Sequence, residues 1–374
     1  MDSDTAGETR RRHGTRFEWI DASLVSLIVG SIVVTVVGGL VQVSFGAYTM
    51  TLQEAWLAVF NPEVVFDPAA WEGFLLGGEI PEMNDRSLIV WNIRLPRVFV
   101  AILVGMNLAV SGAIFQAVTR NELASPYILG VSSGAGLAIL LTLVVFSGLA
   151  PFLPLIASAG GAIAFLLVYV IAWKGGTSPV RLVLAGVIVG TVFQSLQTGL
   201  FFLADDLGVV QTAIAWTTGS LTGVDWEQVR LALPWTALSI LFALVGSRQL
   251  NLLLLGERTA RSLGMPVERV RFALSGVAIV AASGAIAVAG IVGFVGLIVP
   301  HVVRNIVGSD YKRLMLGCVF VGPALMVVAD VGARLGMQVL FGSSGQLPVG
   351  ILTGLIGGPY FLYLMRRTGT LGEI

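Results

Sequence analysis

Charged side chains are scarce in this sequence, and apolar ones are abundant. Only 12% of the 374 residues are Asp, Glu, Lys or Arg, whereas 56% are hydrophobic and the mean hydropathy is +0.89. A soluble globular domain has about 25% charged residues, so this composition excludes that class and predicts a protein of the lipid bilayer. The formal net charge is zero, so no broad basic field points to nucleic acid as a partner.

Side chains that bind metals or act as nucleophiles are also rare. The single cysteine, Cys318, excludes an intrachain disulfide and a thiolate metal cluster, and two histidines, His13 and His301, exclude a histidine-rich metal site. The two lysines, Lys174 and Lys312, are followed by Gly and Arg, so neither fits a phosphate-binding Walker A loop. We therefore expect no catalytic residue, no metal and no bound cofactor on this chain. If ATP drives the protein, a separate subunit uses it.

Long apolar runs recur along the chain, and several are interrupted by glycine or proline. A run of ~20 apolar residues can cross a bilayer as one helix, and we expect about ten such spans. They are predicted at residues 22–43, 93–116, 127–147, 152–173, 180–204, 232–249, 271–291, 293–308, 314–334 and 347–365. The predicted fold class is therefore an all-α polytopic membrane protein. Its transmembrane domain covers residues 22–367, between tails at 1–21 and 368–374.

The basic residues are distributed unevenly across these spans. Arginines at positions 10, 11, 12 and 16 place the amino terminus in the cytoplasm by the positive-inside rule, and ten spans return the carboxyl terminus to the same side. With this topology, 17 of the 22 basic residues lie on or near the cytoplasmic side. We therefore predict a multi-pass protein of the cell (plasma or inner) membrane with both termini in the cytoplasm.

The longest connection, residues 44–92, lies outside the cell in this topology. Thr51-Leu-Gln-Glu54 is a capping-box pattern that begins a short amphipathic helix, which we expect to lie on the outer surface. The following residues, 61–86, carry six carboxylates: Glu63, Asp67, Glu72, Glu79, Glu82 and Asp85. We expect a mobile acidic lobe here, and a solvated loop without a specific role is the simplest interpretation.

A stretch rich in small residues, Ser283 to Arg304, organises the second half of the chain. It is apolar and long enough to span a bilayer, but it carries four glycines and then reaches Pro300 and His301 near membrane depth. Small residues let helices approach closely, and a proline or a charge inside the membrane needs neighbouring protein to satisfy its polar groups. The pattern therefore predicts a packed, irregular part of a multi-helix bundle, and a tight structural helix pair explains it equally well.

The same stretch carries a family resemblance. Residues 293–304, GFVGLIVPHVVR, followed by Gly308 and Asp310, resemble the signature of the FecCD (BtuC-like) permeases. These are the membrane subunits of ABC importers for iron siderophores, haem and cobalamin. Further matching blocks follow the family's order, at residues 94–97, 121–136, 256–264, 329–334 and 347–361, and the resemblance covers roughly residues 44–60 and 91–367. One departure is Glu122, where the family usually has proline. The resemblance implies the BtuC-like bundle of type II ABC importers.

Three arginines at the predicted outer ends of spans are candidates for protein docking. Arginine beside a membrane span is costly unless it reaches water or an anionic partner. Arg94, Arg97 and Arg334 could anchor helix ends, with Arg334 paired to Asp330 one turn away. The resemblance implies instead that they dock glutamates on the two lobes of an extracytoplasmic substrate-binding protein. The planar guanidinium suits this task because it grips a carboxylate with two hydrogen bonds.

Residues 250–269, here called the coupling segment, connect two spans on the predicted cytoplasmic side. We expect a helix from about Leu252 to Leu263, with Gly264 as a left-handed cap, Pro266 starting the next helix, and Ala260 facing outward with Leu263. From the residues alone, this is simply a loop. The resemblance implies that it sits in a groove of the ATPase subunit and transmits its closure, through Gly256, Glu257, Ala260, Leu263 and Gly264.

Residues that line a transport pathway are harder to identify. Thr177 and Ser178 loosely resemble the cytoplasmic gate region of the family's cobalamin permease. Gln194 and Gln197, in the fifth predicted span, are polar enough to line a wet cavity, although hydrogen bonds between helices explain them equally well.

These observations predict the permease subunit of an ABC importer that moves a metal chelate (ferric siderophore, haem or cobalamin) into the cytoplasm. Two copies, two ATP-binding subunits and one binding protein would form the importer, and the sequence does not rank the chelates. The alternative is an ion-coupled secondary transporter, which usually has ionisable groups near the membrane midplane. Here nearly all carboxylates lie in predicted loops, and Asp330 lies near a membrane end. A membrane-embedded enzyme would have few catalytic groups available.

Overall fold

The computed structural model describes residues 21–367 except positions 47, 49, 205 and 343–345, and all regular structure in these residues is helical. The first half contains α1 (Ala22–Ser44), α2 (Leu52–Val59), α3 (Pro62–Val65), α4 (Pro68–Leu76), α5 (Asp85–Ile89), α6 (Leu95–Thr119), α7 (Val131–Val144), α8 (Leu153–Ala172) and α9 (Pro179–Phe201). The second half contains α10 (Leu207–Thr218), α11 (Trp226–Val245), α12 (Ser247–Leu254), α13 (Glu257–Ser262), α14 (Val267–Ala289), α15 (Val295–Val307), α16 (Tyr311–Phe341) and α17 (Val349–Arg367).

Apolar helices occupy all ten predicted spans. Among the described residues, seven helical runs are long and apolar enough to cross a membrane, and α7, α15 and α17 supply three shorter apolar helices. Two boundaries differ most from the prediction: α16 runs on to Phe341 and not to 334, and α11 begins at Trp226 and not at 232. Asp225 caps it there, in a capping box with Gln228, so polar residues that lowered the local hydropathy belong to the helix. The sequence did not predict α10, which precedes α11.

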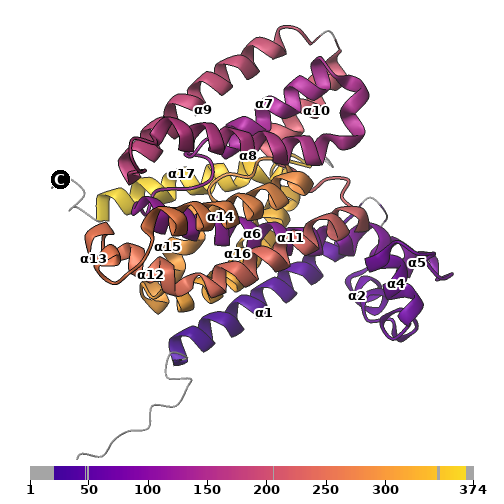
Figure 1. The fold of residues 1–374 in the computed structure, drawn as a ribbon. Coiled ribbons are helices and arrows are strands. Elements are labelled where there is room, and N and C mark those ends of the chain that lie inside the picture. The colour runs from indigo at the N-terminus through magenta and orange to yellow at the C-terminus, as the bar shows by residue number, and fades with distance from the viewer. Residues whose placement is uncertain (1–20, 47, 49, 205, 343–345, 368–374) are drawn as a thin grey trace, which may run out of the picture.

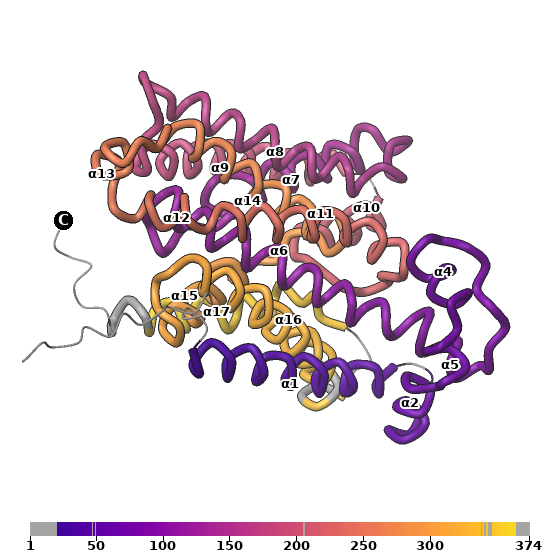
Figure 2. Tube along the Cα trace, turned by 60° about the horizontal axis from the view of Figure 1, so that its bottom comes forward, coloured from indigo at the N-terminus to yellow at the C-terminus, as the bar shows by residue number. Residues whose placement is uncertain are grey.

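The helices form a bundle around α6 (Figure 1). This helix is largely buried and packs against α11, α14, α15 and α16. The helices α7, α8 and α9 form a layer on one side of it, and α1 lies at the opposite edge beside α16 (Figures 1 and 2). The α2–α5 lobe lies at one end of the bundle, and α13 lies at the other end (Figure 1). The bundle thus has two ends with different structures.

The predicted break between α14 and α15 is present as an unwound segment. Gly290 and Phe294 both have positive φ, 68° and 65°, and Phe294 is one of two non-glycine residues in this conformation among the described residues. The freed backbone is satisfied by the last turn of α10 and the residues after it, because the Ile291 amide donates to the Trp216 carbonyl at 2.9 Å and the Ser220 amide donates to the Ala289 carbonyl at 2.8 Å. Irregular backbone is tolerated at membrane depth only where protein covers it in this way.

Glycines bring α6 into direct backbone contact with its neighbours. A Cβ atom added to Gly112 would lie 1.8 Å from the carbonyl oxygen of Gly296 in α15, and one added to Gly105 would lie 2.4 Å from that of Gly322 in α16. Neither position can accept a side chain unless a helix moves. The close packing predicted for the glycine-rich stretch is therefore confirmed at the α6–α15 crossing.

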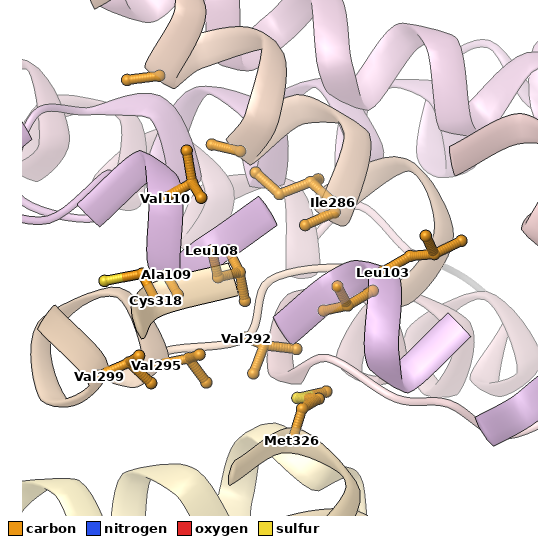
Figure 3. Close-up of a cluster of buried hydrophobic side chains, with 14 of the residues drawn as sticks. Leu103, Leu108, Ala109, Val110, Ile286, Val292, Val295, Val299, Cys318 and Met326 are labelled. Carbon is orange, nitrogen blue, oxygen red and sulfur yellow. The ribbon is translucent and has the colours of Figure 1, made fainter. Parts of the chain in front are cut away.

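Apolar side chains fill the space beside these crossings (Figure 3). The cluster joins four elements, and its members come from α6, from α14 and the segment after it, from α15 and from α16: Leu103, Leu108, Ala109, Val110, Ile286, Val292, Val295, Val299, Cys318 and Met326. Cys318 is fully buried among them, so the only thiol of the chain serves as a small apolar side chain.

Residues 51–89 form a lobe of four short helices in place of the expected mobile loop. The predicted capping box of Thr51 and Glu54 is present at the start of α2. Phe74 stacks between Trp91 and Trp226, with ring centroids 5.4 and 4.8 Å apart. The Trp226 indole N–H also donates to the Trp91 carbonyl at 2.7 Å. This aromatic core attaches the lobe to α11, and four of the six carboxylates of residues 61–86 lie in or cap its helices.

The α6–α15 crossing predicts that Gly112→Ala is strongly destabilising. The added methyl group would overlap the Gly296 carbonyl, and overpacking of this kind costs about 1–3 kcal/mol. Thermal unfolding of the detergent-solubilised protein would measure this loss. Gly276→Ala in α14 is the control, because no atom lies within 4 Å of its new methyl group and alanine favours a helix. Equal melting temperatures for the two variants would contradict the crossing.

Candidate functional site

A buried ion pair links three helices at the end that carries the α2–α5 lobe. Arg97 of α6 donates from Nε to Asp330 Oδ2 at 2.9 Å and from Nη2 to Asp330 Oδ1 at 2.7 Å. Gln42 of α1 donates to the same carboxylate, whose residue in α16 is fully buried. The remaining Arg97 Nη1 donates to Gln346 at 2.6 Å. The two hydrogen bonds of the planar guanidinium thus hold α6 to α16, and Gln42 adds α1.

The other two arginines bind backbone carbonyls at the end of α1. Arg94 is 5% exposed and donates to the carbonyls of Val43, at 2.7 Å, and Tyr48. Arg334 remains partly exposed and donates to the carbonyls of Gln42 and Phe45 at 3.2 and 3.1 Å. The alternative considered for Arg334, a pair with Asp330 one turn away, is not formed, because Arg97 and Gln42 occupy that carboxylate.

These three predicted docking residues therefore lie together but differ in what they can reach. The guanidinium groups of Arg94 and Arg97 are buried and already bonded inside the bundle. A carboxylate on another protein could reach them only after these bonds break. Arg334 is bonded only to carbonyl groups and keeps solvent access. The geometry favours Arg334 as the residue that contacts another protein. Arg94 and Arg97 would hold the neighbouring helices in place.

At the opposite end, the coupling segment divides at Gly256, inside the first of the two helices predicted for it. The chain breaks after α12 at Gly256, whose φ of 95° is left-handed, so the single helix predicted over 252–263 is wrong. The left-handed Gly264 is confirmed, with φ of 80°, and the adjacent Leu263 is 60% exposed as expected. The outward position predicted for Ala260 is wrong, because this residue is fully buried. In a six-residue helix, one face must pack on the bundle, and Ala260 lies on that face.

The predicted gate residues lie in the loop before α9. Thr177 is buried and bonds to Glu268 of α14 through both its amide and its hydroxyl group, at 3.1 and 2.7 Å. Ser178 is the N-cap of α9 and accepts from the Arg181 amide. Arg271 joins this loop to the coupling segment, because it bonds both Thr177 and Glu257. Arg271 was not among the predicted site residues, because it lies 94 positions from Thr177 and helical spacing cannot indicate such a pair.

The two predicted pathway glutamines have different environments. Gln197 donates to the Ser133 carbonyl of α7 at 2.9 Å, so it forms a hydrogen bond between helices. Gln194 is exposed, as are Thr191, Ser195 and Thr198. These four residues follow an i, i+3, i+4, i+7 spacing, so they form one polar stripe along the exposed face of an otherwise apolar helix. Gln194 is therefore the better candidate for a wet surface.

Glu122, which departs from the family pattern, forms ionic contacts with α15. Its carboxylate lies 3.4 Å from Arg304 and 3.9 Å from the His301 ring. Arg304 also donates to Gln116 of α6 at 2.9 Å. The turn after α6 is thus tied to α15 by charge where a proline would have supplied stiffness. Within the described part of the chain, no group of three or more His, Cys, Asp or Glu side chains could hold a metal ion.

Comparisons with known proteins agree with this architecture. The model of the FecCD transport family matches residues 27–367. The chain is 38% identical over 289 residues to the iron(3+)-hydroxamate import system permease protein FhuG of Bacillus subtilis, covering 75% of this chain and 84% of that protein. It is 41% identical to the cobalamin import system permease protein BtuC of Halobacterium salinarum, covering 77% and 75%. For the hemin transport system permease protein HmuU of Yersinia pestis, the identity is 37%, covering 76% and 85%.

A solved structure shares the fold. It is an inward-facing conformation of a protein assigned to the metal-chelate type of ABC transporter. The TM-score is 0.75 at 26% sequence identity, and the match covers 92% of this chain and 99% of that chain. The alignment thus includes nearly the whole helical bundle described above.

The buried pair predicts that Arg97→Gln is far more destabilising than Arg334→Gln. Removing Arg97 leaves Asp330 as an uncompensated buried charge, and breaking such a pair costs about 3–5 kcal/mol. Arg334 donates only to carbonyl groups that lie near solvent, and its loss should cost less than half of that amount. Thermal unfolding in detergent compares the two variants. If Arg97→Gln melts at the wild-type temperature, the pair does not hold α6 to α16.

Proposed function

This chain belongs to the FecCD transport family and is a permease subunit of an ABC importer for metal chelates, and we propose that each end of the bundle binds a different partner. The observation that carries this proposal is the family match over residues 27–367, which includes both candidate regions. The end with the α2–α5 lobe would face outward, and the end with α13 would face the cytoplasm of a cell whose plasma or inner membrane holds the protein. Both termini would then be cytoplasmic.

An extracytoplasmic substrate-binding protein would dock at the lobe end. Arg334 is the proposed contact, since it is cationic, partly exposed and held in place by the last turn of α1. Arg94 and Arg97 would support this surface from inside by fixing α1 against α6 and α16. A guanidinium that is already positioned loses little side-chain freedom when it meets a carboxylate.

A second copy of this chain would face the polar stripe of α9. Hydrocarbon cannot satisfy an exposed amide such as that of Gln194, so a stripe of this kind should face water or protein. By contrast, the exposed face of α1 carries Val25, Val29, Val33 and Val36, which suits lipid. We infer that α9 lines a wet central pathway between two copies, with α1 on the lipid side of each.

An ATP-binding subunit would bind each coupling segment. Leu263 offers an exposed apolar side chain beside Gly264, on a short helix that projects from the bundle end. Neither lysine of the permease chain fits a Walker A loop, so we propose that the permease itself hydrolyses no ATP. Closure of the ATPase would then change which side the pathway opens to, with no chemistry on the substrate.

An ion-coupled secondary transporter would need a carboxylate free to bind its ion. The only buried carboxylate among the described residues is that of Asp330, and Arg97 and Gln42 already occupy it. The named relatives move hydroxamate-bound iron, cobalamin and hemin, so we propose a metal chelate as the class of cargo and do not rank its members.

The decisive experiment measures ATP hydrolysis by this chain co-purified with its candidate ATPase in lipid, with the binding protein added or withheld. We expect hydrolysis that requires this chain and responds to the binding protein. Leu263→Asp should abolish co-purification without lowering the melting temperature, because the side chain is exposed. A wild-type chain that associates with no ATPase would refute the coupling assignment.

Charge reversal should separate docking from folding at the lobe end. Arg334→Glu is expected to weaken binding-protein affinity roughly tenfold at low salt, with a smaller effect at high salt, because screened surface charges act mainly on association. Arg86→Glu is the matched control, since Arg86 is exposed on the lobe and contacts only Glu54 there. Surface-plasmon resonance on lipid nanodiscs measures both. Equal affinities for the two variants would exclude Arg334 from docking.

A further inference from the structure

Arg271 is a fully buried cation at the coupling end of the bundle, and the local sequence accounts for its partner Glu268, three residues earlier on α14, but not for its burial or for its bond to Thr177. It lies in the second turn of α14 and is the largest fully buried side chain among the described residues. Its Nη1 donates to the Thr177 carbonyl at 2.7 Å, to the Thr177 hydroxyl at 3.0 Å and to Glu268 at 3.1 Å. Its Nη2 donates to Glu257 at 2.6 Å.

These bonds join three separate segments of the chain. Glu257 is the first residue of α13, Glu268 lies in the first turn of α14, and Thr177 lies in the loop before α9. Glu268 closes the network, because its Oε2 accepts from both the amide and the hydroxyl group of Thr177. One guanidinium and two carboxylates therefore fix the Thr177 loop to the coupling segment without water.

The network continues directly into α9. The next residue, Ser178, is the N-cap of that helix, and Arg181 in its first turn donates back to the Gly176 carbonyl at 2.7 Å. A displacement of Thr177 therefore acts on the first turn of α9. This is the same helix that carries the exposed polar stripe along the proposed pathway.

The attachment of α13 to the rest of the bundle gives Arg271 its importance. Gly256, with its positive φ, separates α13 from α12, so α13 is not a rigid extension of that helix. Besides Arg271, the described side chains offer only one ionic contact between α13 and α14, from Arg261 to Glu268 at 4.0 Å, and Arg261 is exposed. Exposed pairs of that kind contribute little. The firm polar link from α13 to the bundle is Glu257–Arg271.

We propose that Arg271 is a positioning residue that transmits movement of the coupling segment to the Thr177 loop and the start of α9. The proposal rests on the proposed function of residues 250–269 as the ATPase contact. Arginine is needed because its planar fork presents separate N–H groups to Glu257 and Thr177 at once, whereas a lysine ammonium is a single point of charge. Stability alone is a poor reason to keep such a group, since buried ion pairs are often no better than apolar packing.

The test compares transport per ATP hydrolysed in the assembled importer, reconstituted in vesicles with its ATPase and binding protein. Arg271→Lys keeps the charge and should assemble normally, but it should lower transport per ATP roughly tenfold, a typical size for the loss of coupling between two sites. Thr177→Val removes the hydroxyl group that bonds both Arg271 and Glu268, and Glu257→Gln removes the charge at the other end of the link; each weakens the link and should lower the same ratio. Arg269→Gln is the control, because Arg269 is exposed two residues away on α14.

The possible outcomes are distinct. A lower ratio in the three variants with an unchanged ratio in Arg269→Gln supports the proposal. If hydrolysis and transport fall together at constant ratio, Arg271 is a structural residue only and the proposal is wrong. If Arg271→Lys fails to assemble, the transport per ATP hydrolysed by Thr177→Val and Glu257→Gln tests the proposal instead. Failure of the wild-type chain to assemble with the ATPase would instead refute the proposed function.

Discussion

A guanidinium buried in a membrane protein must find most of its hydrogen-bond acceptors within the protein, and both ends of this bundle depend on that constraint. At the lobe end, Arg97 uses both oxygens of Asp330, and at the other end Arg271 divides its donors between Glu257, Glu268 and Thr177. Each of these two sets of hydrogen bonds joins segments that are far apart in the chain. Between the two ends, α6 contacts its neighbours through glycine backbone, so the middle of the bundle is held by close packing and the ends by charge.

The sequence predicted the features that local physics determines. Long apolar runs identified the spans, because a bilayer requires them, and the α14–α15 break followed from its glycines. Gly264 and the Thr51 capping box were likewise correct, since both depend on residues within one helical turn. The short α10 was missed because its 12 residues are too few to form a span, and the true start of α11 was missed because its polar residues lower the average hydropathy over the window that defines a span.

The sites were less predictable, because their partners are distant in sequence. Arg97 and Asp330 are separated by 233 positions, and Arg271 and Thr177 by 94, so no periodicity relates them. A pairing rule based on helical spacing assigned Asp330 to Arg334, which lies one turn away, and was wrong. The prediction for Ala260 was wrong for a related reason, because the face of a short helix that packs inward depends on the neighbouring elements. Family resemblance suggested candidate site residues but could not supply their geometry.

The end of α1 shows that a counter-ion need not be an acidic residue. Three arginines converge there with one carboxylate among them, and two of the three donate to carbonyl groups of the last turn and the residues just after it. The carbonyl groups at a helix C-terminus carry about half a negative charge, so the helix end offsets part of the excess positive charge. Exchanging one apolar side chain of α1 for another would therefore leave these hydrogen bonds intact, whereas changing the length of the helix would not. An inserted or deleted residue would rotate those carbonyl groups by about 100° and remove them from the arginines.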